Sequence, residues 1–364
     1  MSRKLVALGS IASILGGTAL AEVPDVATDV TPVHSLVARV MEGVGTPELV
    51  IAQGASPHEY SLRPSEARAL QDADLVFWIG EDLTPWMENS IETLAEGAKV
   101  ISLLESDGTE LLDFREGALF EAHDHDSHGH GDEGDDHDGH DDAHDDHAEE
   151  EEHAHDDHDE HDEHHKDEGH EHDDHAEADH DDHDGHDDHH GHDHGDHDPH
   201  AWLSVENASV WLNTIAAALS AADPDNAGTY YANAAAGREE LAQLVGEIGG
   251  VLEPVRGKRF VVFHDAYQYF ETDFDFPASG AISLSDASDP SPARIAEIQE
   301  RVANEGIACV LSEPQYDQKL VATVMDGTPA KTAVIDPLGV DLELGPNLYP
   351  QLLRNLATSL AGCL

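Results

Sequence analysis

The sequence predicts an α/β fold of two lobes, each built on a central parallel-type sheet, with one long rigid helix joining them. Three observations support this fold class. Short apolar segments alternate with helical patterns both before residue 120 and after residue 198. The stretch between Pro224 and Pro254 keeps helical apolar spacing almost without interruption. A chain of 364 residues is also long enough for two domains.

The first lobe is expected to span residues 22–222. Its apolar segments are typical of buried strands, and we expect these at 25–31, 48–52, 75–79 and 99–103. A helix is expected after three of these strands. The first has apolar residues at Leu36, Val37, Val40 and Met41, and the other two are expected at 64–72 and 85–94. This strand and helix rhythm predicts a parallel sheet with crossover helices.

A linking helix is expected at 223–253 and a second lobe at 254–364. At 1.5 Å per residue the helix would be about 45 Å long, which is too long for one small lobe. Strands and helices then alternate again, and we expect them at 259–263, 292–304, 307–311, 318–325, 332–335 and 349–360.

The N-terminus has the features of a secretory signal peptide at residues 1–21. Arg3 and Lys4 precede an apolar run from Leu5 to Leu20, and small residues suit cleavage after Ala21. The run is short for a membrane anchor. We therefore expect an exported chain in an oxidising compartment, without a lipid anchor.

The segment 120–198 is predicted to be a disordered insert in the first lobe. Between residues 123 and 197 lie 25 of the 29 histidines and 35 of the 78 acids, with almost no large apolar side chain. Imidazole and carboxylate groups together bind divalent transition metals, but a flexible chain offers no fixed geometry. The insert therefore indicates a collector or sensor of metal. A merely solvated acidic loop is the alternative.

Composition also limits the partners of this chain. Its formal net charge is −61, which disfavours nucleic acid and anionic membrane surfaces and favours cations. The chain has two cysteines, Cys309 and Cys363. An even number in an exported chain favours one disulfide, and two separate buried thiols remain the alternative.

Four histidines lie outside the insert: His34, His58, His200 and His264. Each is expected at the C-terminal end of a strand or in the loop that follows, where open α/β sheets bind ligands. His58 and His200 belong to the first lobe, whereas His264 and Asp336 end strands of the second. A cleft between lobes could gather three imidazoles and one carboxylate, a ligand set that suits tetrahedral Zn(II).

Several segments together resemble the metal-specific periplasmic binding proteins of ABC importers, and most closely the zinc-uptake, ZnuA-like branch. They are GASPHEYSLRPSEARALQDADLVFWIG (54–80), DPHAWLS (198–204), FVVFHDAYQYF (260–270), EPQY (313–316) and IDPLG (335–339). The resemblance runs from about residue 25 to the C-terminus. It implies two α/β lobes joined by a rigid helix, and a histidine-rich insertion in the first lobe.

The same resemblance implies the ligands. The family's three histidines correspond to His58, His200 and His264, with Asp336 or a water as the fourth ligand. Some members carry a glutamate before the first histidine, but Pro57 stands there in this chain. The family's disulfide corresponds to Cys309 and Cys363. His34 has no firm counterpart and is a weaker candidate near the site.

We therefore expect a monomeric periplasmic solute-binding protein that captures Zn(II) and delivers it to an ABC permease. Manganese is the main rival ion, but three imidazoles favour zinc. A periplasmic zinc buffer is a second alternative. A zinc-dependent hydrolase is a third, with Glu59 as the candidate general base; neither an HExxH motif nor a serine nucleophile elbow supports it. We expect no enzyme activity.

Overall fold

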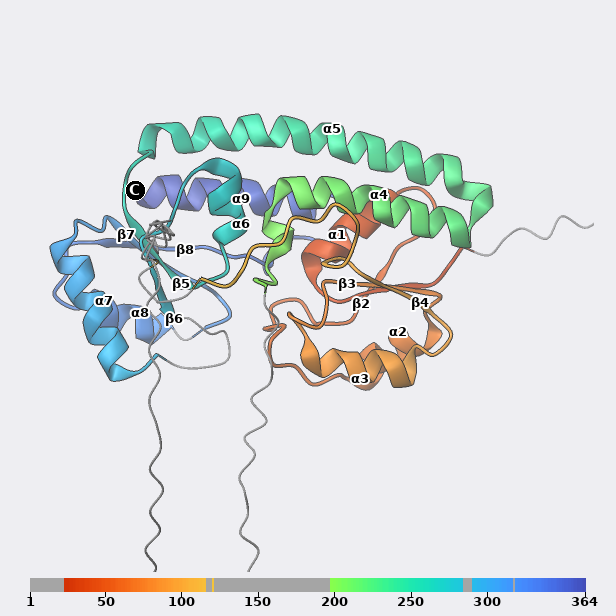
Figure 1. Cartoon of the computed structure of the whole chain (residues 1–364), viewed down its shortest axis with the longest axis horizontal. Helices are drawn as coiled ribbons and strands as arrows, with labels where there is room; N and C mark the ends of the chain where they lie inside the picture. Colours follow the sequence, from red (N-terminus) through yellow and green to blue (C-terminus); the bar gives the residue numbers. More distant parts are fainter. Residues whose placement is uncertain (1–22, 116–119, 121–196, 284–289, 317) are drawn as a thin grey trace, which may run out of the picture. The chain divides into compact units, whose positions relative to one another are not determined.

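The structure is a computed structural model of the chain, and it describes residues 23–115, 120, 197–283, 290–316 and 318–364. The expected signal peptide at 1–21 and nearly all of the expected insert at 120–198 lie outside these residues. The described part forms two parallel α/β lobes and a long helix, which confirms the predicted fold class (Figure 1).

The first lobe contains a four-stranded sheet of order β2-β1-β3-β4, and every neighbouring pair is parallel. The strands are β1 (Val26–Thr28), β2 (Glu48–Leu49), β3 (Leu75–Trp78) and β4 (Lys99–Ser102). The connecting helices are α1 (Thr31–Val40), α2 (Pro64–Asp72) and α3 (Pro85–Leu94), each with proline in its first turn. Proline is favoured there because its fixed φ suits a helix and the N–H that it lacks has no partner within the helix.

Alternation along the strands explains why helices cover both faces of this sheet. Leu75 and Phe77 of β3 join the large core that includes α1, whereas Val76 and Trp78 join a smaller cluster with α2 and α3. Successive side chains of a strand point to opposite faces, so a strand covered on both faces must be apolar throughout.

The second lobe repeats this plan with a parallel sheet of order β6-β5-β7-β8. Its strands are β5 (Phe260–His264), β6 (Ala281–Ser283), β7 (Cys309–Ser312) and β8 (Lys331–Val334). Its helices are α6 (Gln268–Phe274), α7 (Pro292–Asn304), α8 (Gln318–Met325) and α9 (Leu348–Cys363).

Several elements differ from the sequence expectations. α6 and β6 were not predicted, because seven and three residues are too few to establish a helical or strand period. The predicted strands at 25–31 and 48–52 are shorter in the structure. The first ends early because α1 already begins at Thr31, and the second pairs with β1 only through Glu48–Leu49.

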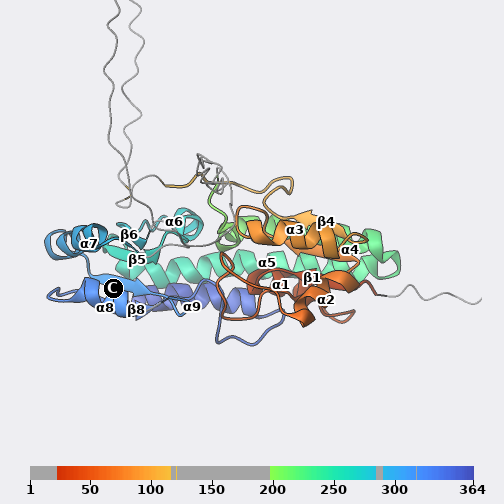
Figure 2. The same ribbon diagram turned by 90° about the horizontal axis from the view of Figure 1, so that it is seen from below.

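The long helix α5 (Ala227–Leu252) has 26 residues, and short 3₁₀ turns at Pro224–Asn226 and Glu253–Val255 flank it. It packs against α1 and α4 (Val205–Ala222) of the first lobe and against α9 of the second, and Figures 1 and 2 show it running along all three. Its buried stripe has the spacing of three and four residues expected of one helix face: Tyr230, Ala234, Gly237, Leu241, Leu244, Ile248 and Leu252. A side chain at Gly237 would meet Leu212 Cδ1 at 2.9 Å, so α4 and α5 approach closely there.

Side chains of the first lobe also bind the loop between β8 and α9, residues 335–347, which we call the β8–α9 loop. Ser35 Oγ donates to Gly345 O at 2.7 Å, and Trp202 Nε1 donates to Pro337 O at 2.9 Å. Gln53 Nε2 donates to two further carbonyls of the loop, and Thr31 Oγ1 to another. One large hydrophobic cluster contains residues of both lobes. The lobes are therefore held by packing and by directed hydrogen bonds.

A disulfide joins Cys309, the first residue of β7, to Cys363, the last residue of α9, with a Cα–Cα distance of 5.8 Å. The sequence expectation of one bridge between the two cysteines is confirmed. In the part of the chain that the structure describes, no helix combines the length and apolar character needed to cross a bilayer.

Asp29 is a fully buried acid directly after β1. Its two carboxylate oxygens accept hydrogen bonds from Val30 N and Ile79 N, each at 2.7 Å. Burial raises the pKa of Asp29 to about 7, although these two hydrogen bonds act in the opposite direction. The carboxyl group therefore joins β1 to the end of β3 and titrates near neutral pH.

This raised pKa gives a prediction for stability. The unfolded chain releases the Asp29 proton near pH 4, whereas the folded protein keeps it to about pH 7. Asp29 thus contributes stability that is fully present below about pH 4 and is lost as the pH rises to about 7. Relative to Asp29→Asn, the free energy of unfolding of the wild type should fall by on the order of 1.4 kcal/mol for each pH unit over this range.

Urea unfolding of metal-free protein at pH 4.5 and pH 7.5 measures this difference. The control is Asp72→Asn, which removes an exposed acid that pairs with Arg68. A difference between wild type and Asp29→Asn that does not change with pH would contradict the prediction.

Candidate metal centre

Three histidines from both lobes lie together. His58 follows β2 in the loop before α2, His200 precedes the 3₁₀ turn Ala201–Leu203, and His264 is the last residue of β5. Each offers a ring nitrogen, and these atoms all lie within 4.8 Å of one another. Among the described residues, His58, His200 and His264 together make a group of His, Cys, Asp or Glu side chains large enough to hold a metal ion.

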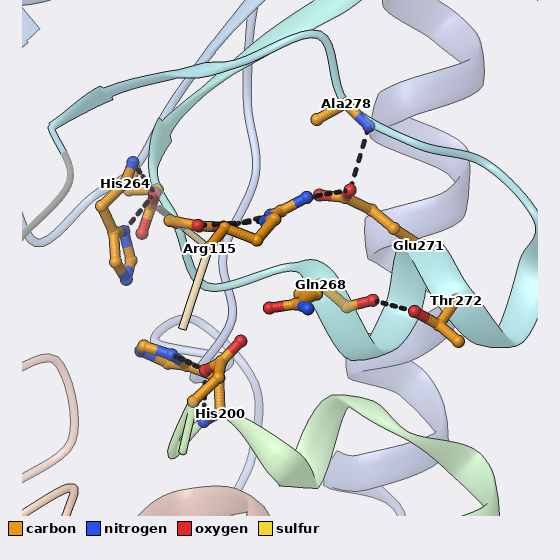
Figure 3. A network of polar contacts seen from close by, with 10 residues as sticks. Arg115, His200, His264, Gln268, Glu271, Thr272 and Ala278 are labelled. Carbon is orange, nitrogen blue, oxygen red and sulfur yellow. Dashed lines mark hydrogen bonds and ion pairs between the residues drawn. The ribbon is translucent and has the colours of Figure 1, made fainter. Parts of the chain in front are cut away.

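The rings converge from different directions. The ring centroid of His200 lies 5.4 Å from that of His58 and 5.3 Å from that of His264, and the ring planes of each pair are tilted or edge-on to one another. Figure 3 shows the His200 and His264 rings pointing toward one another. Tilted rings with converging nitrogens suit a shared ion, because stacked parallel rings would direct their lone pairs apart.

Two buried carboxylates orient two of these rings. Asp198 Oδ1 lies 2.7 Å from His200 Nδ1, and Glu313 Oε1 lies 2.7 Å from His264 Nδ1 (Figure 3). A carboxylate accepts a hydrogen bond, so it assigns the proton of each neutral imidazole to Nδ1. Nε2 is then the nitrogen that can bind a metal, the arrangement common around zinc in proteins.

The main chain reinforces both carboxylates. His200 N donates to Asp198 Oδ1 at 3.0 Å, and Asp198 N donates to Leu112 O at 2.8 Å. Glu313 follows β7 directly and is 1% exposed. A carboxylate buried this deeply keeps a fixed direction, and the ring it binds has little freedom to rotate.

The cavity beside the three histidines has a volume of about 10 Å³ and is lined by both lobes. That volume accepts about one water-sized particle. Its wall combines the ligand candidates with apolar and polar side chains: Ser56, Pro57, Trp202, Glu313, Gln315, Tyr316, Pro337 and Leu338. The cavity therefore suits a single ion.

Tyr267 is buried near His264, with ring centroids 6.2 Å apart. Burial is the main reason that the pKa of Tyr267 lies well above its usual value, and the charges of Glu313 and Asp336 raise it further. Tyr267 is thus a neutral phenol at physiological pH.

Asp336 lies outside the histidine group. Its Oδ1 accepts hydrogen bonds from Gln315 Nε2 and Leu338 N, both at 3.0 Å, and its Oδ2 accepts one from Val340 N at 2.6 Å. These bonds shape the start of the β8–α9 loop, which carries Pro337 and Leu338 to the cavity wall. In this structure Asp336 is connected by hydrogen bonds to Gln315 and to the start of the loop.

The other sequence candidates are also located. His34 lies within α1, and its Nε2 is 3.1 Å from Pro47 O. Burial lowers the pKa of His34, which keeps its ring neutral in a structural role. Glu59 is exposed, and the histidines of the insert other than His197 lie outside the described residues.

Asp198 and Glu313 are the site residues that the sequence did not predict. Both stand inside motifs that were recognised, DPHAWLS and EPQY. The signal for Asp198 was its place two residues before His200. Glu313 is 49 residues from His264, so no local pattern could connect them.

The sequence matches the family model ZnuA, described as "Zinc-uptake complex component A periplasmic", over residues 26–363. Two curated relatives named "High-affinity zinc uptake system protein ZnuA" cover nearly the whole chain. The one from Brucella abortus (strain 2308) is 43% identical over 354 residues, which cover 97% of this chain and 96% of the relative. The one from Paracoccus denitrificans (strain Pd 1222) is 44% identical over 358 residues, covering 97% of each.

Solved structures share the fold. A crystal structure of ZnuA aligns with a TM-score of 0.66 at 18% identity, over 94% of this chain and 99% of that one. The protein FpvC from Pseudomonas aeruginosa in complex with Mn2+ aligns with a TM-score of 0.65 at 16% identity, over 94% and 98%. At these identities the likeness concerns the fold alone. On the family match and the two curated relatives, this chain belongs to the ZnuA family of periplasmic zinc-uptake components.

Proposed function

We propose that this protein captures Zn(II) in the cleft between its lobes and delivers it to the permease of an ABC importer for high-affinity zinc uptake. The observation that carries the proposal is the convergence of His58, His200 and His264 on a cavity for one ion. The names of the curated relatives support zinc as the transported ion. Zinc is therefore the substrate, and the protein performs binding and release without catalysis.

The proposed ligands are Nε2 of His200 and His264, one ring nitrogen of His58, and a fourth ligand. Because Asp336 accepts two hydrogen bonds from the β8–α9 loop and one from Gln315, we propose water in the fourth position, with Asp336 as a supporting residue. Three imidazoles favour Zn(II), whereas manganese prefers carboxylate, carbonyl and water oxygens. This donor set argues against the manganese alternative.

Location and domain organisation are part of the same proposal. The chain is exported to the periplasm after cleavage at Ala21 and acts as a monomer of two lobes (22–222 and 254–364) around a helical link (223–253). The disulfide supports an oxidising compartment, where such bonds persist. The histidine-rich insert collects or senses zinc and raises its concentration near the cleft.

Zinc titration tests whether the cleft or the insert holds the tight site. Competition with a chelating indicator is run on the mature chain and on a chain in which a short Gly-Ser linker replaces residues 123–196. His197 is kept because its Nδ1 lies 3.1 Å from Asp113 Oδ1 at the base of the insert. We expect one tight site in the shortened chain, and we expect His264→Ala to abolish it.

Loss of tight binding in the shortened chain would contradict this expectation and would favour the zinc-buffer alternative.

Binding should also weaken as the medium is acidified, because protons compete with zinc for imidazole nitrogen.

A second prediction concerns the carboxylate behind His264. Glu313→Gln keeps the size of the side chain but removes the charge. Its amide can either accept from Nδ1 through oxygen or donate to Nδ1 through N–H₂, so the His264 proton is no longer held firmly at Nδ1. We expect zinc affinity of the shortened chain to fall by about 10- to 100-fold, the usual effect of losing such a partner.

The matched control is Glu247→Gln, which removes an exposed acid paired with Arg354. An unchanged dissociation constant in Glu313→Gln, measured by the same competition assay, would show that Glu313 does not orient the ligand.

A further inference from the structure

One short segment contacts residues next to two candidate metal ligands, His200 of the first lobe and His264 of the second. Residues 109–115, which we call the crossing segment, follow the last strand of the first lobe and reach α6 of the second. Leu112 N donates to Tyr269 Oη at 3.0 Å, and that hydroxyl donates to Asp198 O at 2.9 Å. Asp198 N returns a hydrogen bond to Leu112 O. This closed set of bonds fixes the chain immediately before His200.

Arg115, at the end of the crossing segment, is bound to two acids of the second lobe. Its Nε donates to Asp265 Oδ2 at 3.0 Å, and its Nη2 to the other oxygen of Asp265. Its Nη1 donates to Glu271 Oε2 at 2.6 Å. Figure 3 shows Arg115 between the chain at His264 and the side chain of Glu271.

Arg115 is largely removed from solvent. The side-chain exposures are 17% for Arg115, 8% for Asp265 and 5% for Glu271. The guanidinium also lies over the ring of Phe120, 3.5 Å from its centroid. Buried, bidentate pairs of this kind are far less screened than surface pairs.

The charges of this group make Arg115 hard to replace. Burial alone would lower the pKa of Arg115, but the charges of Glu271 and Asp265 and their hydrogen bonds outweigh it and raise the pKa. Glu271 Oε2 also accepts from Ala278 N at 3.0 Å, so this carboxylate cannot turn away easily. Without the guanidinium, two buried acids would face one another uncompensated.

The position of Asp265 connects this group to the metal centre. Asp265 follows His264 directly in the chain. The crossing segment therefore binds Asp265, next to His264, through Arg115. It also binds Asp198, which precedes His200 by two residues, through Leu112. Zinc bound to both histidines bridges the lobes, and its release requires these two histidines to separate. Arg115 opposes that separation from outside the cavity.

We propose that Arg115 is a positioning residue that clasps the two lobes behind the metal centre and sets the rate at which zinc leaves it. This inference rests on the proposed function, because it concerns release of the same ion. The guanidinium touches neither the ion nor its ligands. It slows dissociation by opposing the separation of His200 and His264, and entry by the same path is slowed in the same way.

The test uses the full-length mature chain loaded with one equivalent of zinc and mixed with excess chelator. We expect one slow dissociation phase that His264→Ala removes. Arg115→Met should accelerate this phase about 10-fold. Asp265→Asn, which leaves Arg115 paired with Glu271, should accelerate it in the same direction and provides the test if Arg115→Met does not fold.

Co(II) provides a readout that a merely structural role would not change. Visible absorption of Co(II) depends on coordination geometry, so Arg115→Met should alter the band of the cleft-bound ion. The matched control is Arg256→Met, which removes an arginine that pairs with Glu253 and Asp275 at exposed positions near the end of α6.

The outcomes separate the two proposals. Wild-type dissociation rates and Co(II) spectra in both Arg115→Met and Asp265→Asn would overturn the clasp, even if the variants melt at lower temperature. If the wild type shows no slow phase that depends on His264, the proposed function itself fails.

Discussion

Two short hydrogen bonds, from His200 to Asp198 and from His264 to Glu313, are the interactions on which the rest of this structure depends. Each is 2.7 Å long and buried, and each assigns a proton to the side of the ring that faces away from the cavity. A buried carboxylate is costly unless it is well paired, so both must be held by surrounding structure. β7 delivers Glu313, and the crossing segment with Tyr269 holds Asp198. The disulfide at the start of β7 anchors the strand that ends beside Glu313.

These supports explain why the lobes are joined so firmly. Three histidines from both lobes can share one ion only if the lobes keep their relative position. The helix α5, the common hydrophobic core and the bonds to the β8–α9 loop all act on this separation. Such an arrangement favours small adjustments over wide opening of the lobes, and Arg115 adds a charged connection between the crossing segment and the second lobe.

The sequence predicted much of this fold because strands buried on both faces are uniformly apolar and their helices start at proline. It also predicted that His58, His200 and His264 come together, and the structure brings them together. His58 and His264 lie after or at the end of parallel strands, where ligands gather, whereas His200 precedes a 3₁₀ turn. It did not predict α6 or β6, which are too short to show a period. It did not find Glu313, because its partner His264 lies 49 residues away in the chain. Arg115 was equally hidden: a single arginine beside an acidic run has no local pattern that reveals a partner 150 residues away.

The bonds between the first lobe and the β8–α9 loop have a consequence for sequence variation. The donors are side chains, of Thr31, Ser35, Gln53 and Trp202, whereas the acceptors are main-chain carbonyls of the loop. Every residue type carries a carbonyl, so the loop can accept many substitutions without losing these bonds. Each donor, by contrast, depends on one particular side chain. Outside Asp336 and the cavity-lining Pro337 and Leu338, drift in the loop should therefore be nearly neutral for these bonds, and selection should fall on the four donors.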